Sequence, residues 1–381
     1  MRIAIDGRTI VSGKTGVGVY AERVVRSLLE IDRSNQYFLF LVEPQTDLQA
    51  PNLTSILIEG YNKMVLNRIW ENFLMPRFSV RNEIDLFFSP AYALPLLPLA
   101  YRKPKGRAKM RYVVTVHDLV GLLFPETFTP KMYMWQKIFV ANAAKRADKI
   151  ITGSYATKDD FLKLHPIDEW KITVIHHSAD EDFRPIADDE LLGRVRLAYG
   201  LPEKIILFVG TVEPRKNITN LAKAFAALPA PIRNDYTLVI AGKAGWFVGS
   251  IKAQIAELQL ADRIKFLGYV DRRDLPALYN LATVFAYPSI HEGFGFPPLE
   301  AMSCGVPVLC SNTSSFPEVV GDAAVMLSPH EVEGMARELE RLLSNDALRS
   351  DLKARGIARS RQFSARKTAE ETLKVFEEAM R

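Results

Sequence analysis

The residue types that could carry chemistry gather most densely in HEGFGFPPLEAMSCGVPVLCS, residues 291–311. Glu292 is expected in a loop, and Glu300 in the first turns of a helix that the Pro-Pro pair between them starts. The glycines of the Gly-Phe-Gly loop would let backbone N–H groups approach a ligand closely. Taken singly, either glutamate could be a solvated or dipole-complementing residue, but the joint pattern is not ordinary loop composition. A helix start with a glutamate on either side suits an extended ligand with a phosphate in its middle and hydroxyls at both ends.

A second candidate segment is FVGTVEPRKNI, residues 208–218. Gly210 ends a predicted strand, and Arg215 and Lys216 precede a predicted helix at 217–228. Two fixed positive charges therefore lie where an anionic ligand would arrive, and a diphosphate is their natural partner. Standing alone, this pair could equally be a solvated basic turn.

The first half of the chain offers weaker signals. Gly16, Gly18 and Ala21 match the G-x-G-x-x-G/A pattern of dinucleotide sites, but about nine residues separate them from the preceding strand, where that pattern needs a tight turn. The glycines open a helix, so they could form a phosphate-facing or acceptor-facing loop, or a turn without function. His117 ends a predicted strand, which places an imidazole at the carboxyl edge of a sheet. His176 and His177 receive no role.

Strands alternating with helices must position these residues. In both halves, β-branched or aromatic runs of strand length alternate with segments whose apolar residues recur every three or four positions. This alternation predicts parallel sheets with crossover helices. The predicted strands are 2–6, 36–42, 84–89, 111–117, 149–154 and 171–175, then 205–210, 236–242, 263–270, 283–289, 306–311 and 323–328, and two of the predicted helices are 19–31 and 131–147.

A polar, acidic break at 176–190 is interpreted as an interdomain linker. We therefore expect two doubly wound Rossmann-like domains, at 1–185 and 186–363, whose sheet edges face each other across a ligand-binding cleft. Residues 330–381 are predicted to be helical, and Ser364 is the predicted N-cap of a C-terminal helix at 364–381.

Composition limits the classes of protein. With 381 residues and 48% apolar content the chain can build substantial cores, and its two cysteines supply neither a disulfide framework nor a four-ligand zinc site. No secretory signal is visible, so a cytoplasmic protein is expected. Much of the net charge of +5 lies in the stretches 62–81 and 101–111, which could contact an anionic membrane surface, steer an acidic ligand or form a core-facing helix with a basic outer face. A nucleic-acid partner is not expected.

With these residues assembled, the chain resembles the retaining glycosyltransferases of the GT-B fold, glycosyltransferase family 4, and within them the mannosyltransferases. The resemblance spans nearly the whole length: the glycine loop, the His117-Asp118 strand end, GTVEPRKN at 210–217, and E-x7-E followed by AMSCGVPV. It implies that the C-terminal helix can return to the first domain. It also implies roles for individual residues: Lys216 and Arg215 on the donor diphosphate, Glu300 on the ribose, Glu292 with the backbone of Phe294 and Gly295 on the transferred sugar, His117 near its reacting carbon, and the main chain of Tyr269 and Val270 on the nucleobase.

One departure is that many relatives have an arginine directly after the glycine of the second domain's first strand, where this chain has Thr211. Fixed cations and a helix N-terminus can stabilise a departing diphosphate, so neither a metal nor another cofactor is required. Asp180-Glu181-Asp182 resembles a D-x-D metal motif, but it lies in the predicted linker and is rejected as a ligand set. The resemblance implies retention of configuration by front-face attack, with Glu292 as a covalent nucleophile the less favoured variant.

The donor and acceptor are predicted less sharply. GDP-mannose is the first candidate for the donor and a UDP-sugar the second, and the acceptor is a saccharide or lipid-linked saccharide of surface polysaccharide synthesis, met at the inner face of the plasma membrane. Three other functions stay open: a sugar-nucleotide 2-epimerase of the same architecture, an NAD(P)-dependent oxidoreductase that uses the glycine loop, and a noncatalytic sugar-nucleotide-binding protein.

Overall fold

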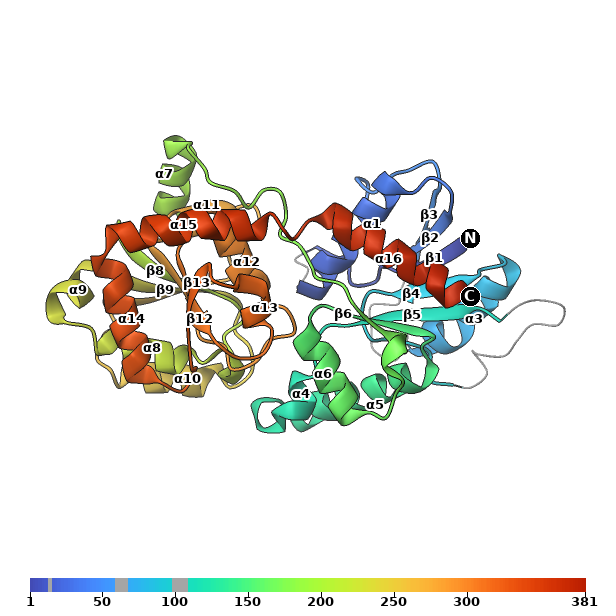
Figure 1. Ribbon diagram of the computed structural model, residues 1–381, viewed down its shortest axis with the longest axis horizontal. Helices are drawn as coiled ribbons and strands as arrows, with labels where there is room; N and C mark the ends of the chain where they lie inside the picture. The colour runs from blue at the N-terminus through green and yellow to red at the C-terminus, as the bar shows by residue number, and fades with distance from the viewer. Residues whose placement is uncertain (13–15, 59–67, 98–108) are drawn as a thin grey trace. The chain divides into compact units, whose positions relative to one another are not determined.

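The computed structural model describes residues 1–12, 16–58, 68–97 and 109–381, in two compact units (Figure 1). Unit 1 comprises Met1–Leu123, Pro130–His177 and Ser364–Arg381, and unit 2 comprises Phe124–Thr129 and Ser178–Phe363. The chain thus passes from unit 1 to unit 2 between His177 and Ser178, at the start of the predicted linker.

Unit 1 is built on a parallel sheet of order β3-β2-β1-β4-β5-β6-β7. Its central strands are buried on both faces, as expected when crossover helices cover a parallel sheet. The strands are β1 (Arg2–Asp6), β2 (Gln36–Leu41), β3 (Leu53–Leu57), β4 (Leu86–Ser89), β5 (Arg111–Val116), β6 (Lys149–Thr152) and β7 (Ile172–Val174).

The helices of unit 1 include one that comes from the far end of the sequence. Helix α16 (Ala365–Met380) lies beside α1 (Gly16–Ile31) and contacts β5 (Figure 1). Its predicted N-cap is confirmed, because the Ser364 side chain accepts a hydrogen bond from Lys367 N at 3.2 Å. The other helical elements are the π-helix η1 (Trp70–Leu74), α3 (Met75–Arg81), α4 (Val120–Leu123), α5 (Pro130–Arg146), α6 (Tyr155–Leu164) and the 3₁₀ turn η4 (Glu169–Lys171).

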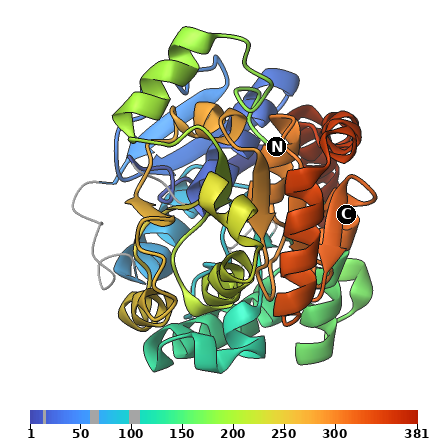
Figure 2. The same cartoon turned by 90° about the vertical axis from the view of Figure 1, so that its left-hand side faces the viewer.

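Unit 2 repeats this design with a sheet of order β10-β9-β8-β11-β12-β13, again all parallel. The strands are β8 (Ile205–Val209), β9 (Thr237–Ala241), β10 (Ile264–Gly268), β11 (Val284–Tyr287), β12 (Val308–Ser311) and β13 (Ala324–Leu327). Helices lie on both sides of the sheet (Figures 1 and 2). They are α7 (Asp189–Ala198), α8 (Ile218–Ala226), α9 (Ala230–Asp235), α10 (Val248–Ala256), α11 (Leu275–Asn280), α12 (Phe296–Ser303), α13 (Phe316–Val320), α14 (Val332–Ser344) and α15 (Asp346–Ser360), with 3₁₀ turns η3 (Pro125–Thr127) and η5 (Pro214–Lys216).

The two doubly wound Rossmann-like α/β folds expected of the GT-B architecture are therefore confirmed, and every predicted strand is present. Strand β3 was not predicted. It lies at the edge of its sheet and all of its residues are exposed or half-buried, so it lacks the apolar run that identified the other strands. Within the basic stretches 62–81 and 101–111, residues 62–67 and 101–108 fall outside the part of the chain that the structure describes.

Candidate functional site

The carboxyl edge of the unit 2 sheet brings the two predicted donor segments together. Strand β8 lies between β9 and β11, so the connections from β8 and from β11 leave this edge side by side. This is the point where the strand order reverses, and ligands of open α/β sheets bind outside the carboxyl ends of the strands at such a point. Arg215 and Lys216 follow β8 in turn η5, and Glu292 follows β11.

Glu292 is the centre of a buried ionic cluster. Its Oε1 accepts hydrogen bonds from Lys216 Nζ at 2.5 Å, Ser289 Oγ at 2.6 Å and Tyr287 Oη at 3.1 Å. Its Oε2 lies 2.7 Å from a terminal guanidinium nitrogen of Arg215. Both carboxylate oxygens therefore have cationic partners, which makes this glutamate an anchor for the two cations that the sequence placed nearby.

The electrostatics of the cluster keep Glu292 ionised. Burial alone would raise the pKa of this carboxyl, but Arg215, Lys216 and the Ser289 hydroxyl outweigh burial and hold the pKa of Glu292 far below its ordinary value. Burial and the neighbouring Arg215 lower the pKa of Lys216, against the opposing effect of Glu292. An ionised carboxylate has no proton to donate, so Glu292 fits an electrostatic role.

Glu213 is a member of this cluster to which we assigned no role from the sequence. It is buried and accepts a hydrogen bond from Arg215 at 2.6 Å, and Arg215 also donates to the carbonyl of His291 at 2.8 Å. Burial raises the pKa of Glu213 although Arg215 and Lys216 oppose the rise. Glu213, Arg215, Lys216 and Glu292 form a largely buried set of two cations and two carboxylates, in which Glu213 and Lys216 are buried and Arg215 and Glu292 are half-buried, and we call it the donor-side quartet.

The loop after β11 is held by hydroxyl groups from the loop after β12. The backbone N–H of Glu292 donates to Ser314 Oγ at 2.9 Å, and Ser315 Oγ donates to the carbonyls of Glu292 and Phe294 at 3.0 and 2.8 Å. Gly295 is the residue before helix α12 and has a φ of 100°, a conformation that favours glycine. The N-terminus of α12 thus begins directly after the loop that carries Glu292, as the sequence predicted.

Helix α12 differs from its prediction in one detail. It begins at Phe296, one residue before the Pro-Pro pair, although a residue before proline usually avoids the helical conformation. A first-turn proline needs no N–H partner, which makes this start possible. Gly305, with a φ of 74°, follows the helix end in a conformation that favours glycine.

Glu300 lies on α12 and has its own partners. It is buried, and its carboxylate accepts a hydrogen bond from Tyr279 Oη at 3.1 Å. A guanidinium nitrogen of Arg272 lies 3.8 Å from the other carboxylate oxygen. Arg272 Nε also donates to Asp180 at 3.0 Å, so the acidic motif set aside as a metal site contributes an ion-pair partner.

The predicted nucleobase contacts follow β10, the edge strand of this sheet, which pairs with β9. Tyr269 is 52% exposed, whereas Val270 is buried. The ammonium group of Lys243 lies 4.5 Å from the centre of the Tyr269 ring. At Gly242 a Cβ atom would lie 1.9 Å from the carbonyl oxygen of Gly210, so the backbones at the ends of β8 and β9 approach too closely for any side chain.

The predicted residues of unit 1 gather at the carboxyl edge of its own sheet. Gly16 and Gly18 are in the first turn of α1, and Tyr20, two residues further, makes an edge-to-face contact with the His117 ring at 4.9 Å between centroids. His117 follows β5, and its Nε2 lies 2.7 Å from the carbonyl oxygen of Pro90. The glycine loop and His117 are therefore linked through Tyr20.

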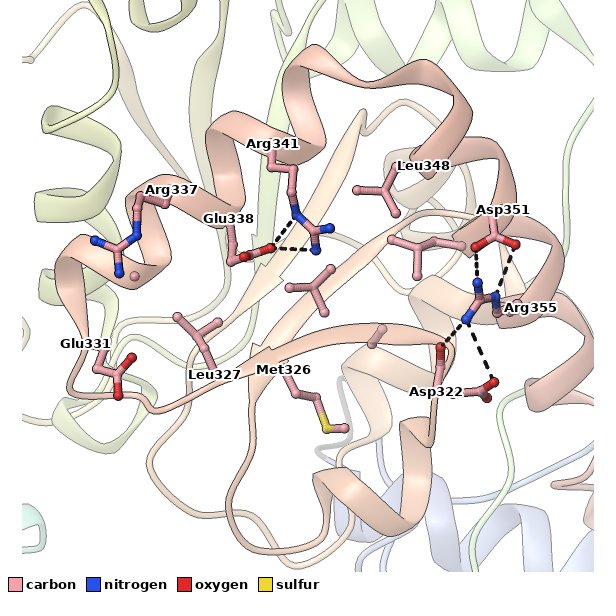
Figure 3. Close-up of a pocket in the computed structure, with 14 residues that line it drawn as sticks. Asp322, Met326, Leu327, Glu331, Arg337, Glu338, Arg341, Leu348, Asp351 and Arg355 are labelled. Atoms are coloured by element: carbon pink, nitrogen blue, oxygen red, sulfur yellow. Dashed lines mark hydrogen bonds and ion pairs between the residues drawn. The ribbon is translucent and has the colours of Figure 1, made fainter.

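A cavity of about 430 Å³ between β13, α14 and α15 is distinct from these sites (Figure 3). None of the predicted site residues lines it. Four carboxylates line it beside three arginines; Arg341 bonds to Glu338 at 2.8 Å, and Arg355 pairs with Asp351. This cavity is not a candidate for a diphosphate.

Several site residues could not be recognised from local sequence patterns. Tyr287 and Ser289 end the strand run before Glu292, so their position was a usable signal, whereas Tyr279, Arg272 and Ser315 reach the site only through the fold. In the described ranges, no three His, Cys, Asp or Glu side chains gather as a metal site. Within the same ranges, the helices are too short or too polar to cross a bilayer.

Two protein-family models match successive parts of this chain. The family model Glycosyltransferase Family 4 matches residues 15–183, and Glycosyl transferases group 1 matches residues 195–359. The O-antigen chain mannosyltransferase B of Escherichia coli is 30% identical over 394 residues, which covers 99% of each chain.

Solved structures share the fold. Sucrose-phosphate synthase (tll1590) from Thermosynechococcus elongatus gives a TM-score of 0.78 at 19% identity, over 99% of this chain and 98% of that one. Anabaena Alr3699/HepE in complex with UDP and glucose gives a TM-score of 0.75 at 18% identity, over 99% of this chain and 100% of that one. At such identities the likeness shows the architecture and not the substrate.

Proposed function

Because this chain is a glycosyltransferase and belongs to glycosyltransferase family 4, we propose that it transfers mannose from a nucleoside-diphosphate sugar to a saccharide or lipid-linked saccharide of a surface polysaccharide. GDP-mannose is the first candidate for the donor and a UDP-sugar the second. The similarity to an O-antigen chain mannosyltransferase over the full length supports the sugar and the acceptor class. The donor-side quartet is the observation that carries the donor assignment.

In the proposed donor complex, Lys216 and Arg215 contact the diphosphate. Both side chains are buried or nearly so. The Glu292 carboxylate lies 2.5 Å from Lys216 Nζ and 2.7 Å from a guanidinium nitrogen of Arg215, so little reorganisation is needed when a phosphate arrives. The backbone at Gly295 and the start of α12 add N–H groups beside the same loop. Glu300, held by Tyr279, takes the ribose hydroxyls, and the main chain at Tyr269 and Val270 takes the nucleobase.

The proposed reaction retains the anomeric configuration and needs no metal. The bond between the sugar's anomeric carbon and the β-phosphate oxygen breaks, and the acceptor oxygen bonds to the same face of that carbon. The acceptor's hydroxyl proton passes to the departing phosphate oxygen. Lys216 and Arg215 stabilise the negative charge that builds on this oxygen, which is where preorganised charge lowers a barrier most effectively.

Glu292 is an unsuitable covalent nucleophile in this arrangement. Both of its oxygens are engaged by cations and hydroxyls, and these contacts stabilise the ionised carboxylate in the ground state. Attack on the sugar would cost those contacts. We therefore assign Glu292 to holding the two cations and, through its loop, the transferred sugar.

The experiment that tests the proposal is a thermal-shift screen followed by a transfer assay. GDP, UDP and their sugars are added to the full chain, and a ligand that binds the native state raises the melting temperature. We expect the largest shift with GDP or GDP-mannose, followed by mannose transfer to a mannose-containing oligosaccharide. Donor incubated without acceptor should yield no epimer, and NAD(P)H should cause no shift. An epimer, or no shift with any nucleoside diphosphate, contradicts the proposal.

We further propose that unit 1 contacts the membrane that carries a lipid-linked acceptor. Ile69 and Phe73 of the η1 region are exposed, as are Met134 and Ile138 of α5, and Arg68 joins the two elements by lying 4.3 Å from the Phe139 ring. Exposed apolar side chains beside cationic ones suit an anionic lipid surface.

Sedimentation with vesicles tests this contact. The full chain should bind anionic vesicles more tightly than neutral ones, and Phe73→Asp should weaken the binding to anionic vesicles. Equal binding to both vesicle types argues against membrane contact.

A further inference from the structure

Four neighbouring strands of unit 1 each deliver one residue to the surroundings of His117. Pro90 follows β4, His117 follows β5, Gly153 follows β6, and His177 comes shortly after β7. These strands are consecutive in the sheet, and the carboxyl ends of parallel strands lie at one edge. The four residues are thus brought together by the fold, although they are spread over nearly ninety residues of sequence, roughly a quarter of a chain this long.

The hydrogen bond between His117 and Pro90 determines which ring nitrogen carries the proton. A peptide carbonyl can only accept, so the contact of 2.7 Å requires Nε2–H as the donor. In the neutral imidazole the other nitrogen, Nδ1, then has a lone pair. Among the described residues Nδ1 has no hydrogen-bond partner, and His117 remains partly exposed.

The charge state agrees with this tautomer. Burial lowers the pKa of His117, against smaller opposing effects of the Pro90 carbonyl and Asp118. The neutral ring therefore predominates at neutral pH.

Two aromatic contacts fix the orientation of the ring. Tyr20 meets His117 edge-to-face, with centroids 4.9 Å apart, and is itself held by a hydrogen bond of 3.1 Å to Thr115. His177 is 2% exposed and lies 5.6 Å from His117 and 4.4 Å from Tyr20 between ring centroids. The three rings form one packed group.

Gly153 is the residue that makes room for His177. A Cβ atom at this position would lie 2.6 Å from His177 Nε2, closer than such atoms approach in folded proteins. Any other residue at 153 must therefore displace the His177 ring, and with it the contacts to Tyr20 and His117. The atoms that such a Cβ would meet belong to His177, so the effect of Gly153 on His117 passes through His177.

We propose that Tyr20, Gly153 and His177 are positioning residues that hold His117 as its Nε2–H tautomer, with Nδ1 left as a hydrogen-bond acceptor for a substrate hydroxyl. The substrate contact rests on the proposed function, whereas the tautomer and its support rest on unit 1 alone. His177, to which we assigned no role from the sequence, thereby becomes a positioning residue for His117.

The tautomer is tested by long-range ¹H–¹⁵N correlation spectroscopy on the full chain labelled with ¹⁵N-histidine. Loss of one set of signals in His117→Gln assigns the ring. The expected pattern is a protonated Nε2 and an unprotonated Nδ1 at neutral pH without any substrate. An Nδ1–H tautomer, or rapid exchange between both tautomers, overturns the proposal whether or not the enzyme uses a mannose donor.

The positioning role is tested with Gly153→Ala. We expect kcat to fall roughly ten- to hundredfold, since small misplacements of a reacting group cost that much, with the KM for the donor changed less than about twofold. The His117 signals should shift in the same variant. Gly193→Ala, in α7 with open space around it, is the matched control and should change neither. Unchanged kcat, or reduced kcat with unmoved His117 signals, overturns the role.

A double-variant cycle separates positioning from loss of folding. Gly153→Ala should lower the melting temperature through its collision with His177, and His177→Ala should remove that collision. The double variant should then melt close to His177→Ala alone, because neighbouring sites are not additive. It should also keep the low kcat, because no ring supports His117. Simple additivity of the two melting-temperature changes contradicts the geometry.

Discussion

The two sheets have the same strand order around their first strands, and each has a largely buried set of two cations and two carboxylates near the end of the first strand. In unit 2 it is the donor-side quartet. In unit 1 it is Asp6 at the end of β1, Arg8, Arg68 and Glu71, in which Arg8 donates to Asp6 at 2.7 and 2.8 Å and to Glu71 at 2.7 Å. Arg68 pairs with the same Glu71. We call this set the unit 1 quartet.

The surroundings of the two quartets differ. In unit 1 the guanidinium of Arg8 is covered by Trp70, 4.4 Å from the ring centre, and its donors are taken up by two carboxylates. In unit 2 the corresponding carboxylate also receives hydroxyls, and a glycine turn and the start of α12 lie beside it. Burial raises the pKa of Glu71 despite Arg8 and Arg68, whereas Arg215 and Lys216 overcome burial at Glu292 and hold its pKa low.

A buried ionic cluster alone is therefore not evidence of a ligand site. An aromatic ring covers the unit 1 quartet, and its cations and carboxylates pair with one another. Its role is to pack η1 against β1. A cluster bordered by hydroxyls, glycines and a helix N-terminus can exchange partners with an incoming anion. The predictions below separate these roles.

The largest effect is expected from Lys216→Ala and Glu300→Ala. Each should reduce kcat by at least about a hundredfold, because each removes a group that acts on the charged donor. The melting temperature should change little for Lys216→Ala, since Arg215 still pairs with Glu292. Steady-state transfer assays and thermal melts check this. Lys204→Ala, on an exposed lysine of the same unit, is the control, and turnover near that of the control would remove the donor assignment.

For Arg8→Ala in unit 1 we expect a loss of stability without a loss of nucleotide binding. It leaves two carboxylates buried without their main cation and should lower the free energy of unfolding by about 3–5 kcal/mol. The melting-temperature increase caused by GDP should be preserved, because the donor site lies in unit 2. Chemical denaturation with and without nucleotide measures both. A lost nucleotide shift with unchanged stability would reverse the roles assigned to the two quartets.

A pH titration distinguishes the two glutamates. The folded-state pKa of Glu292 lies below its unfolded value of about 4.5, so its stabilising effect is present above that pH and is lost as the pH falls below it. Glu71 has a raised folded-state pKa, so its effect has the opposite sign and weakens as the pH rises above about 4.5. Glu292→Gln should flatten the acid limb of a stability curve measured by thermal melts. An unaltered acid limb would show that Glu292 is not charged in this way.

The smallest expected effect is that of a chelator. Because the proposed chemistry draws its positive charge from Lys216 and Arg215, activity should persist in excess EDTA and should not rise when Mn²⁺ is added. The transfer assay repeated with dialysed enzyme is sufficient. Activity that disappears with EDTA and returns with Mn²⁺ would place a metal where we place these side chains.

Much of the fold could be predicted because its signals are local. Apolar runs identified the strands, and the Pro-Pro pair marked the start of α12. Edge strand β3 escaped prediction because it is short and little buried. The predicted site residues were recognisable where a motif is contiguous, as in the segment from Glu292 to Glu300. His177, Glu213 and Tyr279 carried no comparable signal, since an isolated polar or aromatic residue fits many environments.

The amino-acid sequence by itself determined the alternation of strands and helices, the glycine and proline positions that bend the chain, and the presence of cations and carboxylates near strand ends. Only the tertiary structure decided that Lys216 meets Glu292, 76 residues away, and that His117, Gly153 and His177 meet across neighbouring strands. The physical reason is that periodicity and turn chemistry act over a few residues, whereas these contacts depend on strand order. Strand order is set by the packing of whole helices and sheets.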